Sequence, residues 1–140
     1  MDPLSRLEAP SFPGRESGQR VRAFRAMDAF ALEAMEAARF VGRQDADGLA
    51  LEIRRAVARA GSALFAACAS APGSESEREE MKRARARLLE GRYHLYLARR
   101  LGLFDLRRYR AVSFRQEAAL REIDAALQPS SVSQAGRSPP

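Results

Sequence analysis

Apolar residues recur through the middle of this chain at alternating steps of three and four, which places them on one side of an α-helix. The clearest run lies between residues 76 and 100. Its apolar positions are Met81, Ala84, Leu88, Gly91, Leu95 and Ala98. A seam this narrow is typical of a helix in a coiled-coil-like bundle. The spacing therefore predicts a long bundle helix in this segment.

Three other segments repeat the pattern, and we expect helices over about residues 21–41, 47–70 and 106–127. The first carries a stripe, widened by two further residues, of Phe24, Met27, Ala31, Ala34, Ala38 and Val41 with Phe30 and Met35. The second carries Leu49, Ile53, Val57, Ala60, Leu64 and Ala67. The last carries Leu106, Tyr109, Val112, Leu120, Ile123 and Leu127, with Ser113 and Gln116 in its middle. No segment shows the period of two that indicates a strand.

Residues that begin or end helices separate these segments. Gly42 and the Pro72-Gly73 pair follow the first two stripes and predict helix ends there. Ser76 and Glu79 have the spacing of a capping box at the start of the third helix. That helix is expected to close at Arg99, Arg100 and Gly102, and the fourth to begin after a cap at Asp105.

Short connections between four helices predict an all-α fold, an antiparallel up-down-up-down four-helix bundle over residues 21–127. The flanking residues 1–20 and 128–140 are rich in Pro, Gly and Ser and lack periodicity. We expect both flanks to be disordered.

The chain is basic, with a formal net charge of +6 from 24 Lys and Arg against 18 Asp and Glu, and Lys82 is its only lysine. Arginine binds phosphate and carboxylate groups in a bidentate way that lysine cannot. Nucleic acid or an acidic protein surface is therefore the expected class of partner. A GC-rich genome also favours arginine, which would explain the composition but not the positions.

The positions of the arginines form two groups. One is a ridge beside the seam, repeating every seventh residue and about 30 Å long at 1.5 Å per residue, made of Arg78, Arg85, Arg92 and Arg99. The other is a basic pole, where the up-and-down topology brings together the end of the first helix, the start of the second, the end of the third and the start of the fourth. Its charged residues are Arg39, Arg43, Arg99, Arg100, Arg107, Arg108 and Arg110 against Asp45, Asp47 and Asp105. The opposite pole gathers Glu75, Glu77, Glu79, Glu80, Glu122 and Asp124, partly offset by Arg22, Arg25 and Arg78. The pair Arg54 and Arg55 adds a further basic site. These patterns make the ridge, Arg100, Arg107, Arg108, Arg110 and the Arg54-Arg55 pair the candidate nucleic-acid-binding residues.

Several large apolar residues fall outside or at the edge of the seams, namely Phe65, Leu89, Tyr93, Tyr96, Leu97, Phe104 and Phe114. This surplus predicts a homo-oligomer that buries them between copies. The alternative is that wide helix faces bury them within one copy. Tyr93, Tyr96 and Tyr109 could stack on unpaired bases or lie at the boundary with their hydroxyls in water.

The chain offers little for catalysis. His94 is its only histidine, and a pair with Glu90 four residues earlier is more typical of a surface contact than of a metal site. Cys68 is the only cysteine and lies in the apolar phase of a helix, which indicates a buried thiol in a reducing, cytoplasmic setting. We expect no enzyme, no cofactor, no secretion signal and no membrane-spanning helix. An enzyme whose site lies between subunits is the remaining alternative.

The quoted segments together resemble a known family. They are Gly48-Leu49, Glu52-Ile53-Arg54-Arg55-Ala56, Leu95-Tyr96-Leu97-Ala98-Arg99-Arg100-Leu101-Gly102-Leu103 and Leu106-Arg107-Arg108-Tyr109. The chain is similar, over about residues 24–127, to the bacterial four-helix bundle family of 23S rRNA intervening-sequence proteins and of the accessory variability determinants of diversity-generating retroelements. The start of the fourth helix looks more like the retroelement branch.

The resemblance implies a homopentameric ring with a basic surface, which in the retroelement branch engages a reverse transcriptase and its template RNA. The matching basic positions are Arg54, Arg55, Arg99, Arg100, Arg107 and Arg108. The expected function is a non-enzymatic oligomeric adaptor that binds nucleic acid, with RNA and a reverse transcriptase as partners. The alternative is a protein-binding scaffold of the intervening-sequence type that binds no nucleic acid.

Overall fold

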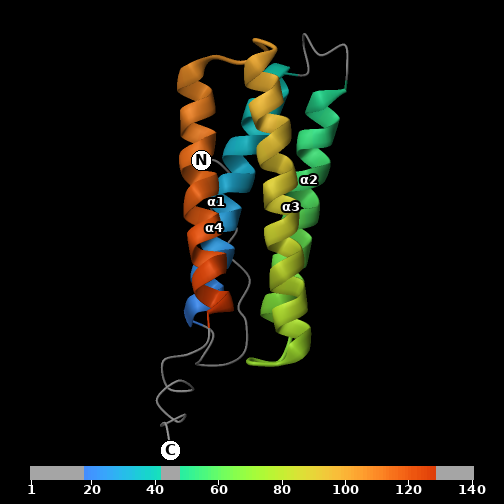
Figure 1. Ribbon diagram of the computed structural model, residues 1–140, viewed down its shortest axis with the longest axis vertical. Helices are drawn as coiled ribbons and strands as arrows, with labels where there is room; N and C mark the ends of the chain where they lie inside the picture. Colours follow the sequence, from blue (N-terminus) through green and yellow to red (C-terminus); the bar gives the residue numbers. More distant parts are fainter. Residues whose placement is uncertain (1–17, 42–47, 129–140) are drawn as a thin grey trace, which may run out of the picture.

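The computed structural model describes residues 18–41 and 48–128, which form four α-helices and no strand. The helices are α1 (Gly18–Val41), α2 (Leu49–Ala69), α3 (Glu75–Arg100) and α4 (Leu106–Leu127). Figure 1 shows them running alternately up and down, so that α1 ends, α2 begins, α3 ends and α4 begins at one pole. This confirms the all-helical, up-down-up-down bundle.

Each helix packs mainly against two others, and the four therefore form a closed square in cross-section. α1 lies beside α2 and α4, and α3 lies beside the same two helices. We call the α3–α4 hairpin and the α1–α2 pair the two broad sides of the molecule. The predicted bundle range of 21–127 begins three residues too late, because α1 starts at Gly18. The expectation of disorder in residues 1–17 and 129–140 lies outside the described residues.

The core follows the predicted seams most closely in α2 and α3. All six seam residues of α3 are buried, and they are all the buried residues of that helix. The six stripe residues of α2 are buried as well, and the buried face extends further to Ala50, Ala56, Ala63 and Cys68. Small residues let α2 and α3 approach closely, since a Cβ built on Gly91 would lie 3.4 Å from the Cβ of Ala56.

The buried face of α1 is turned relative to the predicted stripe. Phe30, expected at its edge, is 1% exposed and lies in the core, whereas Phe24 and Ala31 are only half-buried. Ala23 and Ala37 are fully buried instead. The reason is that α1 packs against both α2 and α4, so its buried face is centred between these two neighbours.

The helix ends show one confirmed cap and one wrong one. The Asp105 carboxylate accepts a hydrogen bond of 2.8 Å from the backbone N–H of Arg108 and caps α4 as predicted. The cap of α3 is Ser74 rather than Ser76, and its hydroxyl accepts from the Glu77 N–H at 3.1 Å. Ser74 and Glu77 have the same capping-box spacing as Ser76 and Glu79, and the helix begins two residues earlier than predicted.

The stripe of α4 contains a buried polar residue. Gln116 is 2% exposed, and its Nε2 donates a 2.8 Å hydrogen bond to the backbone carbonyl of Leu88 on α3. Leu106, predicted on the stripe, is 42% exposed because it lies at the rim of the pole. Over residues 18–41 and 48–128, none of the helices combines the length and the apolar character needed to span a membrane.

Candidate nucleic-acid interface

The arginine pole is built by the turn between α3 and α4. Two backbone hydrogen bonds, from Gly102 N–H to Arg99 O and from Leu103 N–H to Ala98 O, both 3.0 Å long, close the end of α3 as a Schellman motif. Gly102 has a φ of +73°, which the motif requires. The Asp105 cap then starts α4 within a few residues. We define the arginine pole as the five arginines next to this turn, at the end of α3 and the start of α4, namely Arg99, Arg100, Arg107, Arg108 and Arg110.

The arginine pole lacks acidic partners among the described residues. Arg100, Arg107 and Arg110 are exposed, and the ion pairs of residues 18–41 and 48–128 include none of these three and none with Arg99. Asp105 is engaged as the cap of α4. The predicted pole residues Arg43, Asp45 and Asp47 lie outside the described residues.

Arg108 of the arginine pole and Arg39 at the end of α1 are held by contacts within the chain. The guanidinium carbon of Arg108 lies 3.7 Å from the ring centroid of Phe40, a cation–π contact that joins α4 to the end of α1. Arg39 lies 3.5 Å from Glu36 on its own helix. Arg108 is therefore oriented by the fold, whereas Arg39 is partly neutralised.

Three of the four ridge arginines contact α4. Arg78 donates to the carbonyl of Leu127 at 3.0 Å, and Arg85 pairs with Asp124 at 2.6 Å. Arg92 pairs with Glu117. The ridge therefore follows the edge of α3 that faces α4, and these three guanidiniums have partners within the chain. As nucleic-acid-binding residues they are less available than predicted.

The register of these ion pairs places two arginines opposite each other at the pole. Moving from Arg85 to Arg92 on α3 is a step of seven residues, and moving from Asp124 to Glu117 on antiparallel α4 is the same step in reverse. One further step reaches Arg99 on α3 and Arg110 on α4. We call the series Arg85–Asp124, Arg92–Glu117 and Arg99–Arg110 the α3–α4 ladder. Its last step sets two arginines opposite each other, where an acid in place of one of them would form a third ion pair.

Arg54 and Arg55 are exposed in the second turn of α2, on a helix diagonal to α4. Arg55 lies 3.6 Å from Glu52. Both residues belong to the same half of the bundle as the arginine pole, but they lie on its α1–α2 side. The structure does not bring them together with Arg107 and Arg110.

The surplus apolar residues divide into buried and exposed ones. Phe104 is 6% exposed and Leu97 is half-buried, so the bundle itself covers these two. The others remain exposed, as do several apolar residues that the sequence did not single out, giving Phe65, Leu89, Tyr93, Tyr96 and Phe114 together with Leu32, Leu51 and Leu101. Leu32 and Leu51 sit on the polar phase of their helices, which was the available sequence signal. Exposed apolar side chains thus lie on both broad sides of the bundle.

Two further positions considered in the sequence, Glu90 and Cys68, are respectively paired with an arginine and buried. Glu90 accepts a 2.9 Å hydrogen bond from Arg87, which lowers the pKa of its carboxyl, so this acid is paired with an arginine beside His94. Cys68 is buried, and burial raises its pKa to about 11. Within the described ranges, no three His, Cys, Asp or Glu side chains gather in a way that could hold a metal ion.

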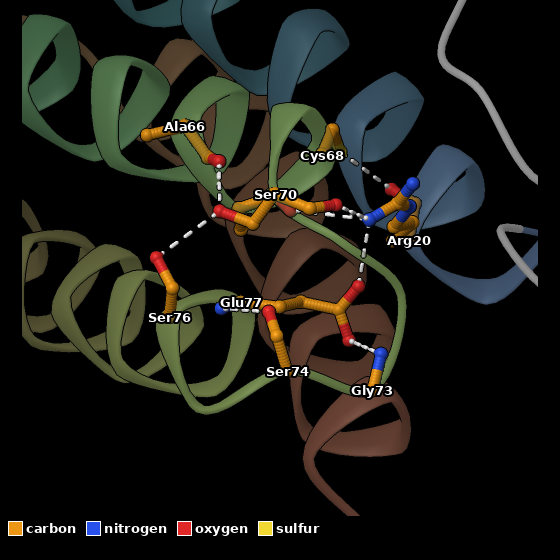
Figure 2. A network of polar contacts seen from close by, with 9 residues as sticks. Arg20, Ala66, Cys68, Ser70, Gly73, Ser74, Ser76 and Glu77 are labelled. Atoms are coloured by element: carbon orange, nitrogen blue, oxygen red, sulfur yellow. Dashed lines mark hydrogen bonds and ion pairs between the residues drawn. The ribbon is translucent and has the colours of Figure 1, made fainter.

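The opposite pole contains a polar network that the sequence did not reveal (Figure 2). Arg20 is 3% exposed, and its Nη1 donates to the Ser70 carbonyl at 2.6 Å and to the Glu77 carboxylate at 2.7 Å. Glu77 also accepts from the Gly73 N–H at 3.3 Å. Arg20 lay in the segment expected to be disordered, although it continues the spacing of Ala23 and Met27.

No protein-family model, no curated protein and no solved structure matches this chain. The function therefore has to be argued from the geometry of the arginine pole.

Proposed function

We propose that this protein is a non-enzymatic adaptor that binds RNA through the arginine pole. The observation that carries the proposal is the register of the Arg85–Asp124 and Arg92–Glu117 ion pairs, which, continued by one step of seven residues, sets Arg99 opposite Arg110. Two guanidiniums facing each other destabilise the free protein slightly. A phosphate group between them would replace this repulsion with charge-assisted hydrogen bonds to both.

The surroundings of this pair support a phosphate-binding surface. Arg100 and Arg107 are exposed beside it, and Arg108 is already oriented by Phe40. Guanidinium groups bind phosphate oxygens in a bidentate way, and backbone contacts of this kind carry little sequence information. We therefore expect low sequence selectivity and a steep dependence of affinity on salt.

The proposal includes self-association and a protein partner. Exposed apolar residues of α1 and α2, among them Leu32, Leu51 and Phe65, support a homo-oligomer in which the α1–α2 side of a copy packs on another copy. The resemblance to the retroelement accessory proteins supports a pentameric ring and a reverse transcriptase bound together with its template RNA. A cytoplasmic location follows from the proposed partners.

The test uses Arg110→Glu, which places an acid where the ladder lacks one. The introduced carboxylate is expected to pair with Arg99 and to leave stability unchanged or raise it by about 0.5 kcal/mol, while RNA affinity falls at least tenfold. Affinity is measured by fluorescence anisotropy with a structured RNA across a salt titration. The matched control is Arg121→Glu, the same charge change at an exposed position of α4 away from the pole.

Equal losses in the two variants would mean that net charge, and not the pole, governs binding. Light-scattering mass with and without RNA reports the oligomer in the same samples. A pentamer that binds RNA with a steep salt slope supports the whole proposal, and a monomer indifferent to RNA contradicts it.

The second candidate function is a protein-binding scaffold. The observation that favours it is that Arg78, Arg85 and Arg92 have partners within the chain and serve the packing of α3 on α4. If the protein is such a scaffold, Arg110→Glu changes neither RNA binding nor its salt dependence, because the wild-type protein binds no RNA.

A further inference from the structure

The outer side of α3 carries two exposed aromatic rings next to the arginine pole. Tyr93 is 61% exposed and Tyr96 is 48% exposed. They are three residues apart, so they project from the same side of the helix. Leu89, one turn before Tyr93 and 39% exposed, extends the apolar surface beneath them. The third tyrosine, Tyr109, is half-buried against Phe104, with 6.2 Å between the ring centroids, so less of its ring is open to a ligand.

Arginines follow these rings toward the pole. Arg100 is four residues after Tyr96 and seven after Tyr93, so the three lie along one side of α3 over about 10 Å at 1.5 Å per residue. Arg99 flanks the same side. Each ring therefore stands within one or two helical turns of a guanidinium that has no ion pair among the described residues.

α4 repeats this arrangement in the opposite chain direction. Phe114 is 66% exposed, the second most exposed large apolar residue of the described chain after Leu32. It is four residues after Arg110, so the two share a side of α4. From the helix ends at the pole, Tyr96, Tyr93 and Phe114 all lie within a band about 6 to 12 Å deep. The α3–α4 side thus combines a rim of arginines with a band of aromatic rings below it.

We propose that this band is a base-stacking platform and that the arginine pole takes single-stranded nucleic acid, with bases on Tyr93 and Tyr96 and phosphates on the arginines. This inference rests on the proposed function and narrows its ligand. A duplex hides the faces of its bases, whereas a single strand offers them to aromatic rings. Stacking on rings beside a basic groove is the usual means of binding single strands without sequence selectivity.

The charge of the surface argues for this ligand over a second copy of the chain. The rings adjoin Arg99, Arg100 and Arg110. The described acids nearest to these residues in sequence are Glu90, Asp105 and Glu117, which are engaged with Arg87, with α4's own cap and with Arg92. A second copy packed here would have to bury these arginines, at a high cost in desolvation. Phosphates neutralise them.

The experiment compares a single strand with an otherwise identical strand whose central nucleotides are abasic, so that phosphates are equal and only the bases differ. The probes are fluorescein-labelled, and binding is measured by anisotropy. Wild-type protein is expected to prefer the strand with bases by about tenfold or more. The variant Tyr93→Ala/Tyr96→Ala is expected to bind both strands equally, with the salt slope unchanged, because its phosphate contacts remain.

Two further variants serve as controls. Tyr93→Phe/Tyr96→Phe keeps the rings and should retain the preference, and Arg110→Glu should weaken both strands together. Failure of the wild-type protein to bind the structured RNA as well as either strand would contradict the proposed function itself, whereas binding of the structured RNA alone would overturn only the single-strand inference. Equal wild-type affinities for the two strands, or a preference that survives in the alanine variant, would overturn the platform alone. A fall in light-scattering mass in the alanine variant would instead assign the rings to contacts between copies and also overturn it.

Discussion

At the residue scale, two polar side chains are buried in the described bundle, Arg20 and Gln116. Each donates a hydrogen bond to the backbone of another part of the bundle. Gln116 links α4 to the backbone of α3, and Arg20 links α1 to the α2–α3 turn. A buried polar group favours the one arrangement that satisfies it, so these two residues specify how the helices align.

Removing Glu77 should destabilise the protein, because it leaves the Arg20 guanidinium buried without its carboxylate. We expect Glu77→Ala to lower the free energy of unfolding by about 3 kcal/mol, measured by urea denaturation followed by circular dichroism. The matched control is Glu79→Ala in the same turn, whose exposed pair with Lys82 spans 3.7 Å and should contribute less than about 0.5 kcal/mol.

The double variant Arg20→Met/Glu77→Ala identifies the cause. If the loss in Glu77→Ala arises from a buried charge, removal of that charge should restore much of the stability. A double variant less stable than Glu77→Ala would show that the arginine contributes chiefly through its contacts with the α2–α3 turn.

The Cys68 thiol should make stability depend on pH in the alkaline range. Burial raises its pKa from 9.0 to about 11, an effect that the charge of Arg20 opposes and that of Glu77 adds to. A raised folded-state pKa means that the thiol's contribution is fully present below pH 9 and declines as the pH rises toward 11. We expect wild type to lose more stability than Cys68→Ala over this window in denaturant titrations. Parallel pH profiles for the two proteins would contradict the burial effect.

At the element scale, the end of α3 depends on a single backbone conformation. Gly102→Ala places a side chain at a φ of +73° and should destabilise the protein by about 1 kcal/mol. The matched control is Gly61→Ala in the middle of α2, where an added Cβ meets only Met27 Cε at 4.0 Å and should stabilise by roughly 0.5 to 1 kcal/mol. Thermal unfolding of the two variants checks the opposite signs.

The same scale shows how far the sequence could predict the fold. The seam of α3 was fully predictable because its six apolar or small residues keep alternating steps of three and four over the whole helix. In α1, many alanines create two overlapping stripes, and only packing against α2 and α4 decides that Phe30 is buried while Phe24 is half-buried. The α3 cap was ambiguous for a similar reason, since two Ser–Glu pairs share one spacing.

The candidate site was predictable in position but not in its internal pairing. The sequence located the arginine pole because helix ends and topology determine it. It did not show that Arg85 and Arg92 meet Asp124 and Glu117, since this requires the register between α3 and α4. The sequence feature that could have indicated this register is the shared spacing of seven residues, between Arg85 and Arg92 on α3 and between Glu117 and Asp124 on α4.

At the scale of the whole molecule, the proposed binding surface and the buried polar network around Arg20 lie at opposite ends of the bundle. The buried network around Arg20 fastens α1, α2 and α3 at one pole, whereas the other pole holds arginines without ion pairs among the described residues. Even exposed ion pairs such as Arg85–Asp124 contribute little to stability, and Arg99, Arg100, Arg107 and Arg110 have no ion pair among the described residues. Substitutions of these four arginines should therefore alter the proposed binding without unfolding the bundle. This separation is what makes the proposed variants interpretable.

Because the bundle has an even number of antiparallel helices, its first helix begins and its last helix ends at the same pole. α1 begins and α4 ends at the pole opposite the arginines (Figure 1). The 26 residues of α3 place about 40 Å between the two poles. A fused domain or a sensor surface joined directly to residue 18 or residue 128 would therefore hold every molecule with its arginines facing outward. Immobilised this way, the protein would present one uniform face to ligands in solution.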